Sequence, residues 1–170
     1  MNPDKFSEIV SSDIPDWSRE DIERFWDPGR KLLRSIRQYQ RCKSRKGTLW
    51  RVIQKYWVIV HWFWSLVTQS EIHLNCNIGG GLRLPHPTGI IVHPDSNIGV
   101  NCQLFHHVTL AGKVTLGGHV DVGAGAQLRG PVTIGDHVQI GFNSVVLNNV
   151  EDGCIVAGIP AKVIATKTSD

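Results

Sequence analysis

Aliphatic residues recur every six positions through the second half of the chain. The series has nine members in unbroken register: Ile98, Leu104, Leu110, Leu116, Val122, Leu128, Ile134, Ile140 and Val146. An α-helix repeats every 3.6 residues and a single strand every two, so neither element accounts for this spacing. A period of six fits a coil of three short flat faces whose aliphatic side chains stack in a central core. We therefore predict a mainly β fold, a parallel β-helix of hexapeptide repeats.

A second position of the repeat is also regular. Four residues after each aliphatic residue comes a small or β-branched one: Cys102, Val108, Val114, Val120, Ala126, Val132, Val138, Ser144 and Val150. The same rhythm extends upstream through Ile72, Ile78, Leu84 and Ile90, and it slips by two residues before Ile98. Thirteen repeats at three per turn predict just over four turns.

The residues that precede the repeat have a helical pattern instead. Residues 14–41 predict two helices broken at Asp27–Gly29, with Ser18 as the cap of the first. Arg41–Gly47 is expected to be a basic linker, and the tryptophan-rich segment Leu49–Val67 to be a further helix. Two interpretations of this last helix stay open. It covers the exposed end of the first coil, or it lies on a membrane surface with the upstream basic residues against anionic lipid.

These patterns divide the chain into three parts. We expect a helical N-terminal region over 1–70, a β-helix domain over 71–165 and a short tail over 166–170. Within the β-helix domain, Val150–Ile164 leaves the six-residue rhythm and is expected to fold back as a final turn.

Charge is distributed unevenly over the N-terminal region. Residues 1–29 carry eight acidic side chains, whereas residues 30–55 carry ten basic ones and no acid. Such a basic run fits contact with phosphate groups, but the solvated faces of helices look the same. The net charge of +3 is too small to indicate a nucleic-acid partner, and none is expected.

Cysteine usage and hydropathy bear on the compartment. The four cysteines have no CxxC pair and no zinc-finger spacing, which favours free thiols in a reducing cytosol. The first 27 residues are polar and acidic, unlike a signal peptide. The uncharged apolar stretch Tyr56–Ser70 is shorter than the ~20 residues of a spanning helix. We expect a cytoplasmic protein, at most peripheral to the inner face of the membrane.

Four segments carry a resemblance to a known family. They are Leu84–Ile90, Val108–Gly112, Ile140–Leu147 and Ala157–Val163. Through them the chain resembles the serine acetyltransferases, whose hexapeptide β-helix is left-handed, and among these it is most similar to members found with exopolysaccharide and capsule synthesis. The resemblance implies direct transfer of an acetyl group from acetyl-CoA to an acceptor hydroxyl. The last two motifs are shared by hexapeptide acyltransferases generally, and the first is narrower.

The resemblance also assigns candidate catalytic residues. His86 matches the catalytic base of the family, and a histidine suits this role because its unperturbed pKa is about 6.5. Glu71, fifteen positions earlier, matches an acidic partner that is usually aspartate. Counted through the slip, Leu104 stacks on Leu84, so His106 is expected one coil above His86. There it either lines the same cleft and binds the acceptor or faces solvent.

Further positions match the CoA site of the family. The resemblance places Ala111 and Gly112 beside the thioester, Ala124 along the pantetheine arm and Lys162 near a phosphate group. The Gly112 N–H is also a candidate to stabilise the oxyanion. Because CoA lies between subunits in the family, a homotrimer with shared active sites is implied. No metal is expected. Phe142 departs from the family, which usually has alanine there.

Other departures concern the acceptor. Pro85 replaces an aspartate before the catalytic histidine, and Gly112 runs directly into Lys113, without the family's long loop and its Arg-His pair. The C-terminal tail that associates with the next enzyme of cysteine synthesis is also lacking. Because the loop helps to hold the charged ends of serine, we expect a sugar hydroxyl on a small-molecule or lipid-linked polysaccharide precursor, with L-serine as the alternative.

Two other classes of protein remain as alternatives. A carbonic-anhydrase-like zinc enzyme shares the fold and the trimer but needs three interface histidines, two of them five residues apart, and the histidines near His86 lack this spacing. The other alternative is a non-catalytic β-helix scaffold or binding module.

Overall fold

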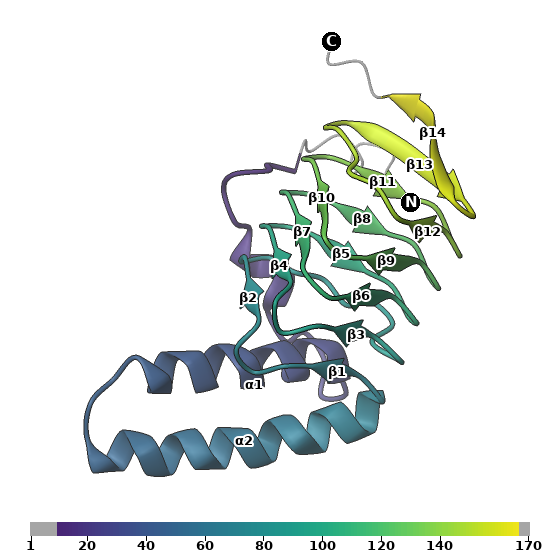
Figure 1. The fold of residues 1–170 in the computed structure, drawn as a ribbon. Helices are drawn as coiled ribbons and strands as arrows, with labels where there is room; N and C mark the ends of the chain where they lie inside the picture. The colour runs from purple at the N-terminus through teal and green to yellow at the C-terminus, as the bar shows by residue number, and fades with distance from the viewer. Residues whose placement is uncertain (1–9, 167–170) are drawn as a thin grey trace.

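Short strands wind into a left-handed parallel β-helix that stands on two α-helices (Figure 1). The computed structural model describes residues 10–166. Within them the strands form three sheets with the orders β1-β3-β6-β9-β12, β10-β7-β4-β2 and β14-β13-β11-β8-β5. The solenoid has about five turns. The mainly β, hexapeptide-repeat fold is therefore confirmed, with slightly more turns than the just over four that the repeats predict.

The strands are short because the chain turns a corner about every six residues. Their bounds are β1 Glu71–Ile72, β2 Asn77–Ile78, β3 Ile91–Val92, β4 Asn97–Ile98, β5 Gln103–Leu104, β6 Thr109–Ala111, β7 Val114–Leu116, β8 Asp121–Val122, β9 Gln127–Arg129, β10 Val132–Ile134, β11 Gln139–Ile140, β12 Val145–Val146, β13 Cys154–Gly158 and β14 Ala161–Thr166. All pairings are parallel except β13 with β14, which is antiparallel.

The core consists of stacked aliphatic columns, one from each sheet. The columns are Ile72, Val92, Leu110, Leu128 and Val146; Ile78, Ile98, Leu116 and Ile134; and Leu84, Leu104, Val122, Ile140 and Val156. The small or β-branched residues of the second repeat position are buried between them, Ser144 included, except for Val150, which is partly buried. Since each column continues through successive turns, the apolar side chains remove one another from water along the whole solenoid.

The slip in the repeat lies at a different place from the one expected. Ile72 pairs with Val92, so Val92 and not Ile90 holds the aliphatic position of that turn. Ile90 takes the second buried position. The two extra residues therefore lie between Leu84 and Ile90, in a corner of five residues, and not between Ile90 and Ile98. The corresponding corner one turn above has three residues. The sequence did not determine where the slip lies, because aliphatic residues stand on both sides of the corner.

The helical region differs in part from the expectation. The first of the two predicted helices is only a short 3-10 turn, η2 (Trp17–Glu20), and its cap is Asp16, whose carboxylate accepts a hydrogen bond from Ser18 N. The predicted cap, Ser18, is therefore wrong. Helix α1 (Pro28–Lys43) begins after Asp27, which caps it, and it extends three residues into the predicted linker. Helix α2 (Thr48–Thr68) confirms the predicted tryptophan-rich helix.

The first coil is covered mainly by α1 and less by the tryptophan-rich helix. Leu32, Leu33 and Ile36 of α1 are almost fully buried and belong to the same apolar cluster as the solenoid core. Helix α2 packs along α1 on the outside, and its one buried residue is Thr68 (Figure 1). The apolar stripe of α1 therefore supplies most of this cover, and Leu49–Val67 contributes the partly buried Trp64, which packs against the same cluster.

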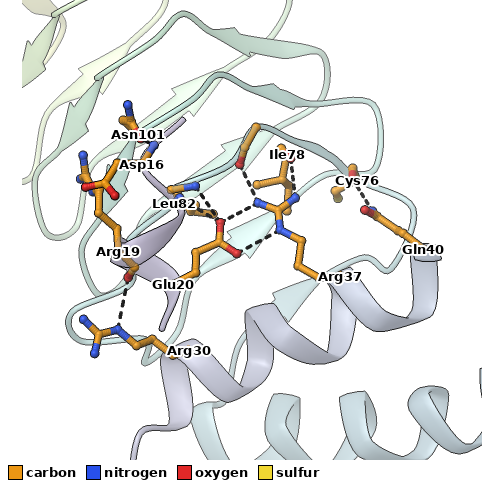
Figure 2. Close-up of polar contacts among 12 residues, drawn as sticks. Asp16, Arg19, Glu20, Arg30, Arg37, Gln40, Cys76, Ile78, Leu82 and Asn101 are labelled. Carbon is orange, nitrogen blue, oxygen red and sulfur yellow. Dashed lines mark hydrogen bonds and ion pairs between the residues drawn. The ribbon is translucent and has the colours of Figure 1, made fainter. Parts of the chain in front are cut away.

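Side chains from η2 and α1 also satisfy the backbone groups at the open edge of the first turn. The Arg37 guanidinium donates to the carbonyl oxygens of Ile78 and Gly79, each at 2.6 Å. It also pairs with Glu20, which accepts from the backbone N–H groups of Gly81 and Leu82 (Figure 2). Unpaired backbone groups at such an edge cost free energy when buried, so this network stabilises the end of the solenoid.

The segment before η2 packs on the outside of the solenoid, and the segment after β12 forms its last turn. Asn101 holds the first segment: its amide nitrogen donates to the carbonyl oxygens of Ser11 and Ile14, and its amide oxygen accepts from Asp16 N, all at 2.8 Å. At the other end, β14 folds back antiparallel on β13, as expected for a final turn.

Candidate active site

His86 lies in the long corner of the first turn, between the buried residues Leu84 and Ile90. Its side chain is exposed, whereas both of these neighbours are buried. Because this corner has two more residues than the one above it, the imidazole stands on an enlarged loop and not on the regular surface. Its outward direction agrees with the expectation for a residue two positions after a core leucine.

Aromatic rings gather on the same edge of the prism. His106 lies one turn above His86, with 6.1 Å between the ring centroids, as the stacking of Leu104 on Leu84 predicts. Phe105 also contacts His86, at a centroid distance of 6.4 Å, and it contacts Phe142 at 6.4 Å from the other side. The structure therefore brings His86 and His106 together. The ring pair Phe105–Phe142 is a feature that the repeat pattern did not single out.

Ala124 lies between these rings along the same edge. The backbone N–H of Gly125 donates to the His106 carbonyl, and the Asn143 N–H donates to the Ala124 carbonyl. Phe142 lies one turn above Ala124, and its ring contacts that of Phe105 two turns below. Four residues therefore follow one another along the exposed edge from the first turn upward: His86, His106, Ala124 and Phe142.

Glu71, Ala111 and Gly112 meet in a different place. They line one cavity of about 540 Å³ between the outer face of the β1-β3-β6 sheet and the end of α2, which contributes His61 and Ser65. Glu71 is exposed on β1. Among residues 10–166, the structure records no hydrogen bond or ion pair between Glu71 and His86. Their pairing stays a prediction.

The turn at Gly112 is tight. Val114 N donates to the Gly112 carbonyl at 2.9 Å, and the Ser96 hydroxyl donates to the same oxygen at 2.8 Å. Gly112 has a φ of +81°, which only glycine adopts without strain. β6 therefore passes into β7 with two intervening residues, and the long loop of the serine acetyltransferases has no counterpart between these strands. Lys162, the remaining predicted contact, is exposed on β14.

A second cavity lies beside the His86 corner. It has a volume of about 370 Å³, and four arginines line it: Arg19, Arg24, Arg30 and Arg83. Pro85 and Pro87, the neighbours of His86, belong to the same wall. Sequence reasoning missed this cavity, because Arg19, Arg24 and Arg30 belong to a region without repeats, where spacing does not reveal which side chains approach the β-helix.

No metal centre and no membrane span emerge from the residues that the structure describes. Within 10–166, no group of three or more His, Cys, Asp or Glu side chains is arranged to hold a metal ion. No helix in the same range is both long and apolar enough to cross a membrane.

Comparison with known proteins adds a consistent set of relatives. The serine acetyltransferase of Helicobacter pylori strain J99 is 39% identical over 106 residues, which cover 58% of this chain and 62% of that protein. The enzyme of Escherichia coli K12 is 33% identical over 135 residues, covering 66% and 50%. The chain is similar to serine acetyltransferases. It spans about half the length of the curated relatives that it matches, and no protein-family model matches it.

Solved structures of serine acetyltransferases share the fold. A complex with CoA superposes with a TM-score of 0.69 at 30% identity, over 82% of this chain and 57% of that one. The Brucella abortus enzyme, also in complex with coenzyme A, gives a TM-score of 0.72 at 27% identity, over 88% and 62%. The likeness therefore includes the helices at the base of the solenoid as well as the repeats. The more specific resemblance to capsule-associated members is not addressed by these relatives.

Proposed function

We propose that this protein is an acetyl-CoA-dependent O-acetyltransferase. The observation that carries the proposal is the exposed imidazole of His86 on the one enlarged corner of the described β-helix, in a chain whose relatives are serine acetyltransferases. Solved relatives that hold CoA support the choice of acyl donor.

The reaction needs a base, because a hydroxyl group is a poor nucleophile while it keeps its proton. In the proposed mechanism, the Nε2 or Nδ1 atom of His86 removes the hydroxyl proton as the oxygen attacks the thioester carbonyl. The Gly112 N–H is proposed to stabilise the oxyanion of the tetrahedral intermediate. When the intermediate collapses, the C–S bond breaks and the imidazolium returns the proton to the thiolate of CoA. Glu71 is proposed to stabilise the imidazolium.

We infer that three subunits assemble to complete the site. In one chain, Glu71, Ala111 and Gly112 line a cavity that His86 does not line. In a closed ring of three copies, the His86 edge of one subunit would face the Ala111–Gly112 region of the next. CoA would run along the groove between them, past Ala124, with its phosphates towards Lys162. Analytical ultracentrifugation tests this assembly, and a stable monomer that transfers acetyl groups would exclude it.

Two acceptors compete. The first is L-serine. The relatives named above are serine acetyltransferases, and this similarity favours serine over the sugar expected from the sequence. A sugar hydroxyl on a polysaccharide precursor is the second candidate. It is favoured by the two-residue connection between β6 and β7 and by the arginine-lined cavity beside His86.

The acceptor is tested by release of CoA thiol from acetyl-CoA. The protein is incubated with L-serine or with a panel of nucleotide sugars, and the His86→Ala variant serves as the control for uncatalysed hydrolysis. Release that depends on serine assigns serine as the acceptor, and release that depends on a sugar assigns the second candidate. Absence of release with every acceptor, together with no thermal shift at millimolar acetyl-CoA, would favour a non-catalytic module.

The exposed face of α2 supports a peripheral contact with membranes. Leu49, Val52, Ile59, Trp62 and Leu66 are each more than three-fifths exposed on this face. The basic residues of 41–55 lie at the same end of the helix as Leu49 and Val52. An amphipathic helix of this kind binds an anionic surface through apolar insertion and charge. Cosedimentation with anionic vesicles tests the contact, and equal recovery with neutral vesicles would exclude the electrostatic part.

A further inference from the structure

The arginine-lined cavity beside His86 has more positive than negative charge. Its lining has four arginines against two acids, Glu23 and Asp27, a net excess of two positive charges. Both acids are turned towards Arg30, at 3.0 Å and 3.4 Å. The pKa of Glu23 is lowered, first by its hydrogen bond from Arg30 and then by the positive charges around it. Arg24 and Arg83 also line the cavity, and they share the Glu23 carboxylate with Arg30.

Arg19 has unsatisfied donors. Its Nε and Nη1 atoms are buried, and no hydrogen-bond partner for them exists among the residues that the structure describes. Burial lowers the pKa of Arg19 and the charge of Arg83 lowers it further, whereas Asp121 and Asp16 act in the opposite direction. Buried donors on a charged group cost free energy unless an acceptor reaches them. An anion in the cavity would offset the positive charges of Arg24 and Arg83, which both line it.

The position of the cavity connects it with the acceptor and not with CoA. Its wall includes Leu84, Pro85 and Pro87, the residues on both sides of His86. Most of its other lining residues come from η2, from the segment that follows it and from the first turn of α1, at the N-terminal end of the solenoid. Lys162, the proposed contact of the CoA phosphates, lies on β14 at the opposite end. A phosphate group in this cavity would therefore belong to the second substrate.

We propose that this cavity binds the diphosphate group of a sugar-diphosphate acceptor and presents a sugar hydroxyl to His86. The inference rests on the proposed acetyl transfer and selects the sugar over serine. Arginine forks match the oxygens of phosphate groups, and two linked phosphates use several of them at once. Trp26, whose side chain lines the cavity and is 61% exposed, offers a ring for stacking.

The first experiment measures binding without acetyl-CoA, so that it does not depend on catalysis. Isothermal titration of the full chain with inorganic pyrophosphate is expected to show one saturable site per subunit. Arg24→Gln and Arg83→Gln are each expected to weaken the affinity at least tenfold. Arg129→Gln, which removes the same charge from an exposed position on β9, is the matched control and is expected to keep the wild-type affinity. No saturable binding, or an equal loss in all three variants, would overturn the proposal.

The second experiment uses turnover. With a diphosphate sugar as acceptor, Arg83→Gln is expected to raise the acceptor KM at least tenfold while kcat and the KM for acetyl-CoA stay within twofold. Two arms, a nucleoside diphosphate sugar and a short-chain prenyl diphosphate sugar, distinguish a soluble from a lipid-linked source, and turnover of either supports the proposal. Turnover of serine that pyrophosphate does not inhibit would overturn it and leave the acetyl transfer intact. Pyrophosphate binding without thiol release from any acceptor would instead overturn the acetyl transfer.

Discussion

The first turn of the β-helix and the turns above it use the same hexapeptide, but they differ at one corner and at one edge. Between Leu104 and Val146, each turn adds eighteen residues and leaves the outline of the prism unchanged. In the first turn, two additional residues enlarge the corner that holds His86, and η2 and α1 cover the edge. The candidate base therefore lies where the regularity ends, while the regular turns carry His106 and the positions proposed to contact CoA.

The largest expected effect comes from removing the imidazole of the enlarged corner. His86→Ala should lower the rate of acetyl transfer by ~10²–10⁴-fold, because no other base replaces it. The affinity for CoA, measured by titration, should stay within twofold. His106→Ala provides the comparison one turn above and is expected to raise the acceptor KM more than it lowers kcat. Near-normal turnover of the His86 variant would show that the enlarged corner does not supply the base.

A second variant tests the shape of the corner and not its chemistry. Replacing Pro85–Gly89 by the three residues Phe-His-His copies the corner one turn above and keeps a histidine at its centre. We expect a folded solenoid with at least ~10²-fold lower transfer, because a catalytic group displaced by ~1 Å or more loses this much. Circular dichroism checks the fold and thiol release checks the rate. Full activity in the shortened corner would mean that the two extra residues have no catalytic purpose.

The covered edge is tested by Arg37→Met. This change breaks the ion pair with Glu20 and removes the donors to the carbonyl oxygens of Ile78 and Gly79. Loss of one partner from such a pair costs about 3–5 kcal/mol of the free energy of unfolding when the pair is buried, and this one is 17% and 10% exposed. Denaturant unfolding measures the loss. Arg34→Met, on the exposed side of the same helix, should change it by less than about 0.5 kcal/mol.

The smallest expected effect concerns His61, at the junction of both helices with the first turn. Its ring is within hydrogen-bond distance of the hydroxyl groups of Ser35 and Ser65, at 3.0 and 3.3 Å. Burial lowers the pKa of His61 below its ordinary value of 6.5. The folded state therefore favours the neutral ring, and the unfolded state takes up the proton first. The resulting stability is present above pH 6.5 and is lost as the pH falls through the lowered pKa.

Unfolding midpoints in urea measured between pH 7.5 and 5 check this dependence. His61→Gln should flatten the decline at low pH, whereas His107→Gln, at an exposed position, should keep the wild-type slope. A wild-type slope in the His61 variant would assign the pH dependence to other groups.

Much of the fold followed from spacing alone, because a six-residue period has one simple realisation. The stacking of His106 above His86 followed from it too, since Leu84 and Leu104 belong to one column. The position of the slip did not follow, because Ile90 and Val92 are both aliphatic and both buried. The spacing also did not predict which part of the β-helix η2 and α1 contact. Arg37 and Glu20 meet across seventeen residues, and only the folded edge reveals the carbonyl oxygens that they serve.

The closure of both ends by segments outside the repeat has a consequence for the size of the molecule. Neither α1 nor β14 depends on how many identical coils lie between them. Insertion or removal of one eighteen-residue coil in the middle would thus change the separation of His86 and Lys162 by about 4.8 Å, the spacing of adjacent strands. In the proposed mode of CoA binding, the length of the solenoid would set the distance between the thioester beside His86 and the phosphates beside Lys162.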